Sequence, residues 1–171
     1  MSQENIFNFI VDKENLTVKV ERSFEAPLDM VWAAWTEAEL LDQWWAPKPY
    51  KAITKVMDFR EGGRWQYAMT SPEGQKVAWD LKDFKKIDPK KSFTHLSRFC
   101  DEDGNVAPGT QGSTWTTSFT ENNGITIVTN DIQVPSIEHL EKQLKMGFKE
   151  GYSMGLNQLE ELLASLQEKG K

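Results

Sequence analysis

Apolar and polar residues alternate along most of this chain, and strict alternation is typical of strands with one buried face. The pattern is clear in the segment 16–24, where apolar residues occupy every second position at the start. The segment 6–11 is also rich in strand-forming residues, and the polar residues between the two predict a hairpin. Alternation resumes between residues 50 and 131, where turn sequences divide it into about six further antiparallel strands.

Residues rich in glycine and asparagine mark the turns between these strands. The sequence Asn-Asn-Gly at 122–124 is a strong hairpin signal, because Asn and Gly accept the positive φ of a tight turn. Gly62 and Gly63 form another turn, and their surroundings lack the spacing of a phosphate-binding loop. The segment 101–112 is rich in Gly, Asp and Pro and predicts a longer loop.

Helical spacing replaces alternation directly after the first two strands. Apolar residues three and four positions apart predict two short helices, over 28–35 and 37–44. Pro27 is suited to the start of the first helix, where its missing N–H breaks no hydrogen bond. The Ala-Pro-Lys-Pro turn at 46–49 ends the second helix, since residues before proline disfavour the helical region.

Two adjacent tryptophans, Trp44 and Trp45, lie at the end of this second helix. Neighbouring side chains point in different directions in any regular structure. We expect Trp44 to pack the helix pair onto the sheet, and Trp45 to line a cavity or its entrance. The alternative is that both rings belong to the core.

A long helix is predicted after Pro135, with Ser136 as its N-cap and an apolar face that continues to about residue 167. Each glycine inside a helix costs about 1 kcal/mol relative to alanine. Either the helix packs closely on the sheet or kinks, or the missing side chains leave room for a ligand beside Phe148 and Tyr152. The glycines in question lie four residues apart on one face: Gly147, Gly151 and Gly155.

Consecutive hairpins followed by one long helix predict the α+β class, with a curved antiparallel sheet wrapped around that helix. The chain has 171 residues, which suggests a single domain over 1–171. A sheet that curves around a helix encloses space between the two. What fills that space is the functional question.

Charge and composition narrow the classes of partner. The net charge is −6, and without a strong basic cluster this argues against nucleic acid. The basic stretch 82–91 contains interspersed acidic and apolar residues, so we interpret it as a solvated strand end and turn. No apolar run reaches the length of a membrane span, and no signal peptide is evident. The single cysteine, Cys100, is typical of a reducing cytoplasm, and we expect a cytoplasmic protein.

Residues able to carry out catalysis are scarce, and we assign no catalytic residue, metal or cofactor from the sequence. His95 shares the strand parity of Phe93 and Phe99, so it is a general base, a polar contact for a ligand, or a buried histidine whose hydrogen bonds are satisfied. His139 lies in the first turn of the predicted long helix, and we expect it to be exposed. No cluster of Cys and His has metal-ligand spacing. Other acid–base candidates are Tyr67, Tyr152, Asp80 and Asp83.

Several motifs together resemble the SRPBCC superfamily, and more narrowly its AHSA1-like group, related to the C-terminal domain of the activator of Hsp90 ATPase. The opening 22–27 followed by 31–36 and then Trp-Trp-Ala-Pro at 44–47 is similar to the start of that group. The segment 58–65 resembles its Asp-Leu-Arg-x-Gly-Gly turn, and Gly151-Tyr152 with the leucines that follow resembles its last helix. The motifs occur in order over about residues 16–166. Tyr152 departs from the group, which usually has Trp there.

The resemblance implies the helix-grip fold, also called Bet v 1-like or START-like, in which sheet and helix surround an apolar cavity. Our leading hypothesis is a binder of a small apolar or aromatic molecule without catalysis. The alternatives are a regulator of an Hsp90-type chaperone ATPase and a cavity enzyme that acts on a bulky ring substrate. Relatives of this fold often pair through sheet edges or helices, so a homodimer also stays open.

Strand parity and helix position together select the expected ligand-binding residues. The chain contains seven Trp, nine Phe and three Tyr, and many of them share the parity assigned to the concave face. The expected lining residues are Trp45, Trp65, Tyr67, Met69, Trp79, Phe93, His95, Phe99, Trp115, Phe119, Phe148, Gly151 and Tyr152.

Overall fold

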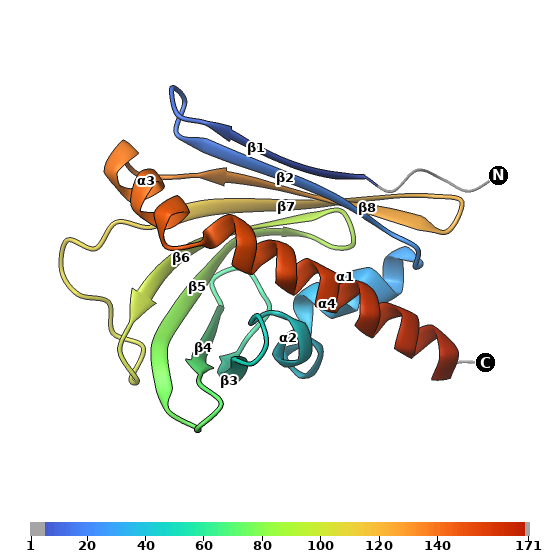
Figure 1. The fold of residues 1–171 in the computed structure, drawn as a ribbon, viewed down its shortest axis with the longest axis horizontal. Helices are drawn as coiled ribbons and strands as arrows, with labels where there is room; N and C mark the ends of the chain where they lie inside the picture. Colours follow the sequence, from blue (N-terminus) through green and yellow to red (C-terminus); the bar gives the residue numbers. More distant parts are fainter. Residues whose placement is uncertain (1–5, 170–171) are drawn as a thin grey trace.

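The computed structural model describes residues 6–169 and contains a strongly curved sheet with a long helix across its concave face (Figure 1). The two short helices lie near one end of the sheet and a third short helix near the other. The elements are β1 (Phe7–Asp12), β2 (Thr17–Phe24), α1 (Leu28–Thr36), α2 (Ala38–Trp44), β3 (Lys51–Met57), β4 (Arg64–Thr70), β5 (Lys76–Asp88), β6 (Ser92–Cys100), β7 (Ser113–Asn122), β8 (Ile125–Gln133), α3 (Ile137–Lys145) and α4 (Phe148–Lys169).

The sheet order is β1-β2-β8-β7-β6-β5-β4-β3, and every neighbouring pair is antiparallel. Bulges interrupt the register between β3 and β4, between β4 and β5, and within the β5–β6 pair. Bulges increase local twist, so they favour curvature in this half of the sheet. The α+β helix-grip architecture expected from the sequence is therefore confirmed.

Local turn chemistry explains why the strands pair as they do. Asn123 and Gly124 both have positive φ and join β7 to β8 by a two-residue turn, as the Asn-Gly signal predicts. The segment 101–112 forms the expected long loop between β6 and β7. Part of this loop folds back on the convex face, where the Gln66 amide donates to the Asp101 and Glu102 carbonyls.

The prediction of one uninterrupted helix after Pro135 is wrong, because the chain breaks at Gly147. Gly147 has a φ of +92°, a conformation that ends α3 before α4 begins at Phe148. Ser136 caps α3 as expected, and its hydroxyl accepts from the His139 backbone N–H at 3.1 Å. The glycine that seemed to weaken a helix therefore forms a corner between two helices.

The space near α1 and α2 is filled by aromatic side chains rather than left open. Trp32 makes edge-to-face contacts with three phenylalanine rings, at centroid distances of 5.0–5.8 Å. Trp35 and Trp44 meet edge to face at 4.7 Å, and both are buried. Such pairs stabilise a core beyond the area they bury. The three phenylalanines against Trp32 are Phe59, Phe93 and Phe119.

Candidate functional site

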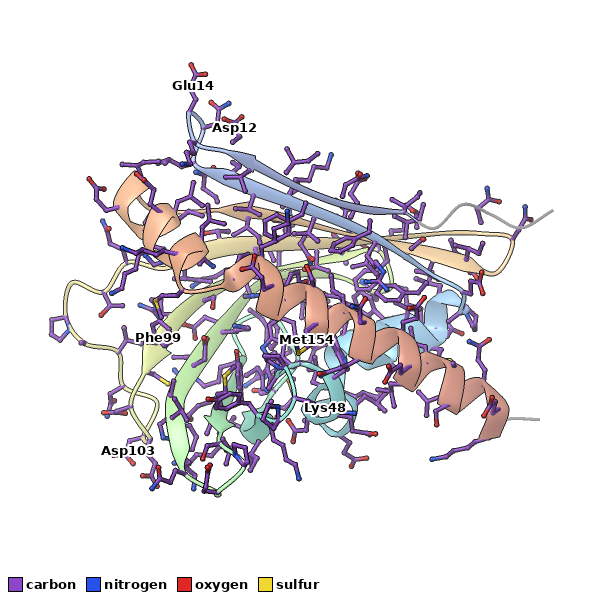
Figure 2. The ribbon with its side chains drawn as sticks, viewed as in Figure 1. Asp12, Glu14, Lys48, Phe99, Asp103 and Met154 are labelled. Carbon is purple, nitrogen blue, oxygen red and sulfur yellow. The ribbon has the colours of Figure 1, made fainter. Side chains whose placement is uncertain are left out.

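A cavity of about 610 Å³ lies between the other half of the sheet, α3 and the start of α4. Rings and a methionine form much of its wall: Trp45, Tyr67, Met69, Phe99, Trp115, Phe148 and Tyr152. Phe99 and Met146 also line it although they are 64% and 73% exposed, so the cavity opens to the surface beside them. Figure 2 places Phe99 at the end of the sheet away from α1 and α2. The volume is typical of sites for small molecules.

The two adjacent tryptophans divide as the sequence predicts. Trp44 is fully buried, and its indole N–H donates to the Ala34 carbonyl at 2.9 Å, which ties α2 to α1. Trp45 lines the cavity, and its indole N–H donates to the Tyr67 hydroxyl at 2.7 Å. One ring therefore fixes the helix pair and the other forms a wall.

Helix α4 fixes the position of Trp45 through polar contacts to the backbone around it. The Gln158 amide donates to the Trp44 and Ala46 carbonyls at 3.1 and 2.8 Å and accepts from the Lys48 N–H at 2.8 Å. A Cβ added at Gly155 would lie 3.3 Å from the Trp44 carbonyl oxygen. The bare face of the helix therefore allows backbone to approach backbone, and the cavity wall becomes rigid.

A buried lysine forms the polar floor of the cavity. Lys82 is 3% exposed, and its ammonium group donates to the Asp80 carboxylate at 3.1 Å and the Ser97 hydroxyl at 2.9 Å. The same nitrogen lies 5.3–5.8 Å from the ring centroids of Trp45, Trp65 and Tyr67. Cation–π attraction and the ion pair together offset part of the cost of burying the charge.

Asp80 is the carboxylate in contact with this floor, and its side chain keeps 21% exposure. Its Oδ1 accepts from Lys82 and, at 3.3 Å, from the Ser97 hydroxyl. Tyr67 stands directly opposite Asp80 in the β4–β5 register, on the same face of the sheet. Burial, and then the charge of Asp80, raise the pKa of Tyr67 well above 10.0, so its hydroxyl keeps its proton.

A second series of hydrogen bonds connects α4 to the sheet below the cavity. The Tyr152 hydroxyl donates to the Asn130 side-chain carbonyl, and the Asn130 amide donates to the Thr117 hydroxyl at 3.0 Å. All three residues are buried, and burial raises the pKa of Tyr152 well above 10.0. Tyr152 therefore presents its ring to the cavity while its hydroxyl is engaged elsewhere.

Of the thirteen residues expected to bind ligand, eleven fall into two groups in the structure, and Trp79 and His95 are described below. Those that line the cavity are Trp45, Tyr67, Met69, Phe99, Trp115, Phe148, Gly151 and Tyr152. Three others lie behind the wall or in the filled half: Trp65, Phe93 and Phe119. Trp65 stacks on Tyr67 at 4.5 Å, and Phe93 and Phe119 pack under Trp32. Strand parity identified the concave face for these three but not how far the filled core extends.

Trp79 is placed on the wrong face by the sequence analysis. Asp80 and Lys82 line the cavity, so Trp79, which precedes Asp80 and is in phase with Leu81, points to the convex side. The Lys55 ammonium lies 5.7 Å from its ring centroid. The parity was misjudged because Trp79 faces outward on this strand, whereas the charged Asp80 and Lys82 face inward.

His95 does not reach the cavity either. Its ring stacks between Phe93 and Trp115, at 6.0 and 5.7 Å, and neither nitrogen has a hydrogen-bond partner among the described residues. Burial, and then the charge of Lys82, lower its pKa well below 6.5. Of the three roles considered for His95, burial among rings agrees with the structural one, but the satisfied hydrogen bonds expected for it are absent among the described residues.

The sequence analysis missed polar residues of the cavity. Lys82 was included in a solvated basic stretch, and this was wrong for Lys82 because its strand parity turns it inward. His139 was expected to be exposed, yet it is half-buried and lines the cavity with Lys142 from the same helix. The parity of Tyr67 and its pairing with Asp80 were the signals that could have located Lys82.

Neither a metal site nor a membrane-spanning helix is supported by the described residues. Within residues 6–169, no group of three or more His, Cys, Asp or Glu side chains is placed to hold a metal ion. Over the same range, every helix is too short or too polar to cross a membrane.

Comparison with known proteins agrees with the motifs and the fold. Residues 25–164 match the family model described as Activator of Hsp90 ATPase homolog 1-like protein. The chain belongs to this family. The crystal structure of protein Ms6760 from Mycobacterium smegmatis is 32% identical to this AHSA1-like chain with a TM-score of 0.84, and the alignment covers 95% of this chain and 99% of that one.

Two further structures show how far the likeness extends. A protein from Arthrobacter aurescens, solved by NMR, is 26% identical with a TM-score of 0.85, and 92% and 91% of the two chains are covered. The AHSA1 protein from Silicibacter pomeroyi is 20% identical with a TM-score of 0.68 over 86% and 97%, which bears on the fold alone. Curated protein sequences give no match to the chain.

Proposed function

We propose that this AHSA1-like protein binds a small apolar or aromatic molecule in the cavity between β4–β7 and α3–α4, without catalysis. The observation that carries the proposal is the open cavity of about 610 Å³ whose walls are mainly aromatic. Apolar walls with a few placed polar groups are the usual composition of small-molecule sites. Aromatic rings fill the half of the concave space near α1. Curvature of the sheet alone therefore does not leave a cavity, and the open half depends on the side chains around it.

Rigid walls favour such a role. Gln158 fixes the backbone on both sides of Trp45. The hydrogen bonds from Tyr152 through Asn130 to Thr117 fix the opposite wall. A preformed cavity loses less conformational entropy when a ligand binds. His95, the residue considered first as a general base, is outside the cavity, and the acid–base candidate Asp80 lines it in an ion pair with Lys82.

Intrinsic tryptophan fluorescence tests the proposal, because Trp45 and Trp115 are in the wall and Trp79 is not. We expect saturable quenching by members of a panel of apolar ring compounds, flavonoids and fatty acids. The signal change should shrink in Trp115→Phe and persist in Trp79→Phe, the matched control that also removes one indole. Quenching that disappears in Trp79→Phe and persists in Trp115→Phe would place the ligand elsewhere and contradict the proposal.

Regulation of an Hsp90-type chaperone ATPase is the second candidate, and the description of the matched family supports it. The outer strand β3 carries partly exposed Ile53 and Val56, which could meet a protein partner. A pull-down with such a chaperone and a measurement of its ATPase rate test this alternative. Association at micromolar concentration with a changed rate would support it. The absence of both effects would count against it.

A further inference from the structure

We propose that the cavity selects ligands carrying a neutral hydroxyl group on an apolar ring system, with the hydroxyl held between Asp80 and Tyr67. This inference rests on the proposed function and names the class of ligand. It comes from the unused hydrogen-bonding capacity of these two side chains, which face the cavity from adjacent strands.

Asp80 has one oxygen in use and one free. Its Oδ1 accepts from Lys82 and Ser97, whereas Oδ2 has no donor among residues 6–169. The side chain is 21% exposed and lines the cavity. A carboxylate oxygen that faces an apolar cavity is a strong acceptor for a ligand O–H, because bonds to charged groups are stronger than neutral ones.

Tyr67 supplies the complementary donor. Its oxygen accepts the indole N–H of Trp45 at 2.7 Å, while its own hydrogen has no acceptor within the described part of the chain. Tyr67 and Asp80 are a direct cross-strand pair that lines the cavity, so their side chains start about 5 Å apart on the same face of the sheet. A hydroxyl can accept from Tyr67 and donate to Asp80 at the same time.

The charges of the floor disfavour ionic ligands. The ion pair between Lys82 and Asp80 is neutral overall, and Lys82 directs its protons to Asp80, Ser97 and the surrounding rings. A carboxylate placed here would face the free oxygen of Asp80, and an ammonium would lie near the Lys82 ammonium. A neutral hydroxyl meets neither repulsion, whereas an anion would be attracted by Lys142 and Arg98 at the cavity wall, which the carboxylate probe below tests.

Four matched probes test the inference by calorimetry on the full chain: para-phenylphenol, para-methylbiphenyl, biphenyl carboxylate and the aminomethylbiphenyl cation. They share a two-ring body and differ in the polar group. We expect the phenol to bind about tenfold or more tighter than the methyl compound, since a hydrogen bond to a charged acceptor contributes at least that factor. The carboxylate and the cation should bind more weakly than the phenol.

Variants assign the preference to its residues. Tyr67→Phe should reduce the phenol-to-methyl ratio severalfold. The double variant Asp80→Asn with Lys82→Met, which leaves no unpaired buried ammonium, should reduce it further while the methyl compound still binds. Asp88→Asn is the matched control, because Asp88 is an exposed residue at the end of the same strand and does not line the cavity, and it should keep the full ratio.

The outcomes separate the inference from the proposed function. Three results would overturn the inference while ring binding itself stands. They are equal binding of the phenol and the methyl compound, tightest binding of the carboxylate, and a phenol-to-methyl ratio that is unchanged in both Tyr67→Phe and the double variant. No binding of any probe would contradict the proposed function and the inference with it.

Discussion

A buried ammonium group needs a counter-charge, and in this protein Asp80 supplies it to Lys82. The side chain of Lys82 is 4% exposed, so loss of its partner leaves a charge that water cannot solvate. Breaking one side of a buried ion pair typically costs about 3 kcal/mol or more. The ion pair between Lys82 and Asp80 therefore matters for stability and also forms the floor of the cavity.

We therefore predict that Asp80→Asn lowers the free energy of unfolding by about 3 kcal/mol, measured by urea denaturation. Asp83→Asn removes the same charge from the same strand but leaves Arg98, whose side chain is 26% exposed, and should cost clearly less. The double variant with Lys82→Met should recover part of the loss. Equal costs for the two aspartates would contradict the account of Lys82.

His95 makes stability depend on pH in a defined direction. Its folded-state pKa lies well below 6.5, so as the pH falls below 6.5 the unfolded chain binds a proton that the native state does not. The stability contributed by neutral His95 is present above pH 6.5 and is lost as the pH falls, by up to about 1.4 kcal/mol per unit.

We predict that His95→Phe removes this contribution. Urea unfolding between about pH 7.5 and 5.5 should show a smaller loss of stability for the variant than for the wild type. His139→Gln removes the other histidine and shows how much of the slope belongs to His95. A wild-type slope that survives in His95→Phe would show that other groups titrate.

Single residues were predictable from the sequence only where the strand parity was assigned correctly. Trp45 and Tyr67 were, because both lie on segments with clear signals. Trp79 and Lys82 were not, because the expectation that rings face inward and charges outward is reversed at these two positions of β5. A buried lysine depends on tertiary partners that its local sequence does not reveal.

At the scale of elements, α4 has two interior glycines with different surroundings. A Cβ at Gly155 would lie 3.3–3.4 Å from the carbonyl oxygens of Trp44 and Trp45, whereas a Cβ at Gly151 meets only Pro47, at 3.8 Å. One glycine permits a close backbone approach, and the other leaves room beside the cavity. The close approach expected from the sequence occurs at Gly155, but to the backbone at the end of α2 rather than to the sheet, and room for a ligand at Gly151 stays a prediction.

We predict opposite effects of alanine at the two positions. Gly151→Ala should stabilise the protein by up to about 1 kcal/mol through helix propensity. Gly155→Ala should be destabilising, since backbone at the contact must move. Thermal unfolding of the two variants measures the difference, and a stabilised Gly155→Ala would contradict the packing described for α4.

The order of elements was predictable because local signals and tertiary structure agree there. The two short helices and the Asn-Gly hairpin were located within one or two residues. The break at Gly147 was not, because the apolar spacing continues through it and only the positive φ ends the helix. Periodicity describes which face is buried and says little about where a helix turns a corner.

For the whole molecule, the central feature is an uneven division of the concave space. Rings under α1 fill one half, and the half under α3 and the start of α4 stays open. The sequence predicts an aromatic interior but not this division, since the division depends on which rings meet across the sheet. The claim that the open half is a binding site is therefore the one to test.

Calorimetric titration of a panel of apolar ring compounds into Gly151→Leu, beside Gly151→Ala and the wild type, tests it most directly. The leucine side chain projects from the cavity wall and should occupy ligand space, while alanine adds one methyl group in ordinary contact with Pro47. We predict that ligands bind the wild type and Gly151→Ala alike, and that Gly151→Leu loses tenfold or more in affinity, an effect of about 1.4 kcal/mol. Unchanged affinity in a folded Gly151→Leu would mean that the ligands bind outside the cavity and would contradict the account.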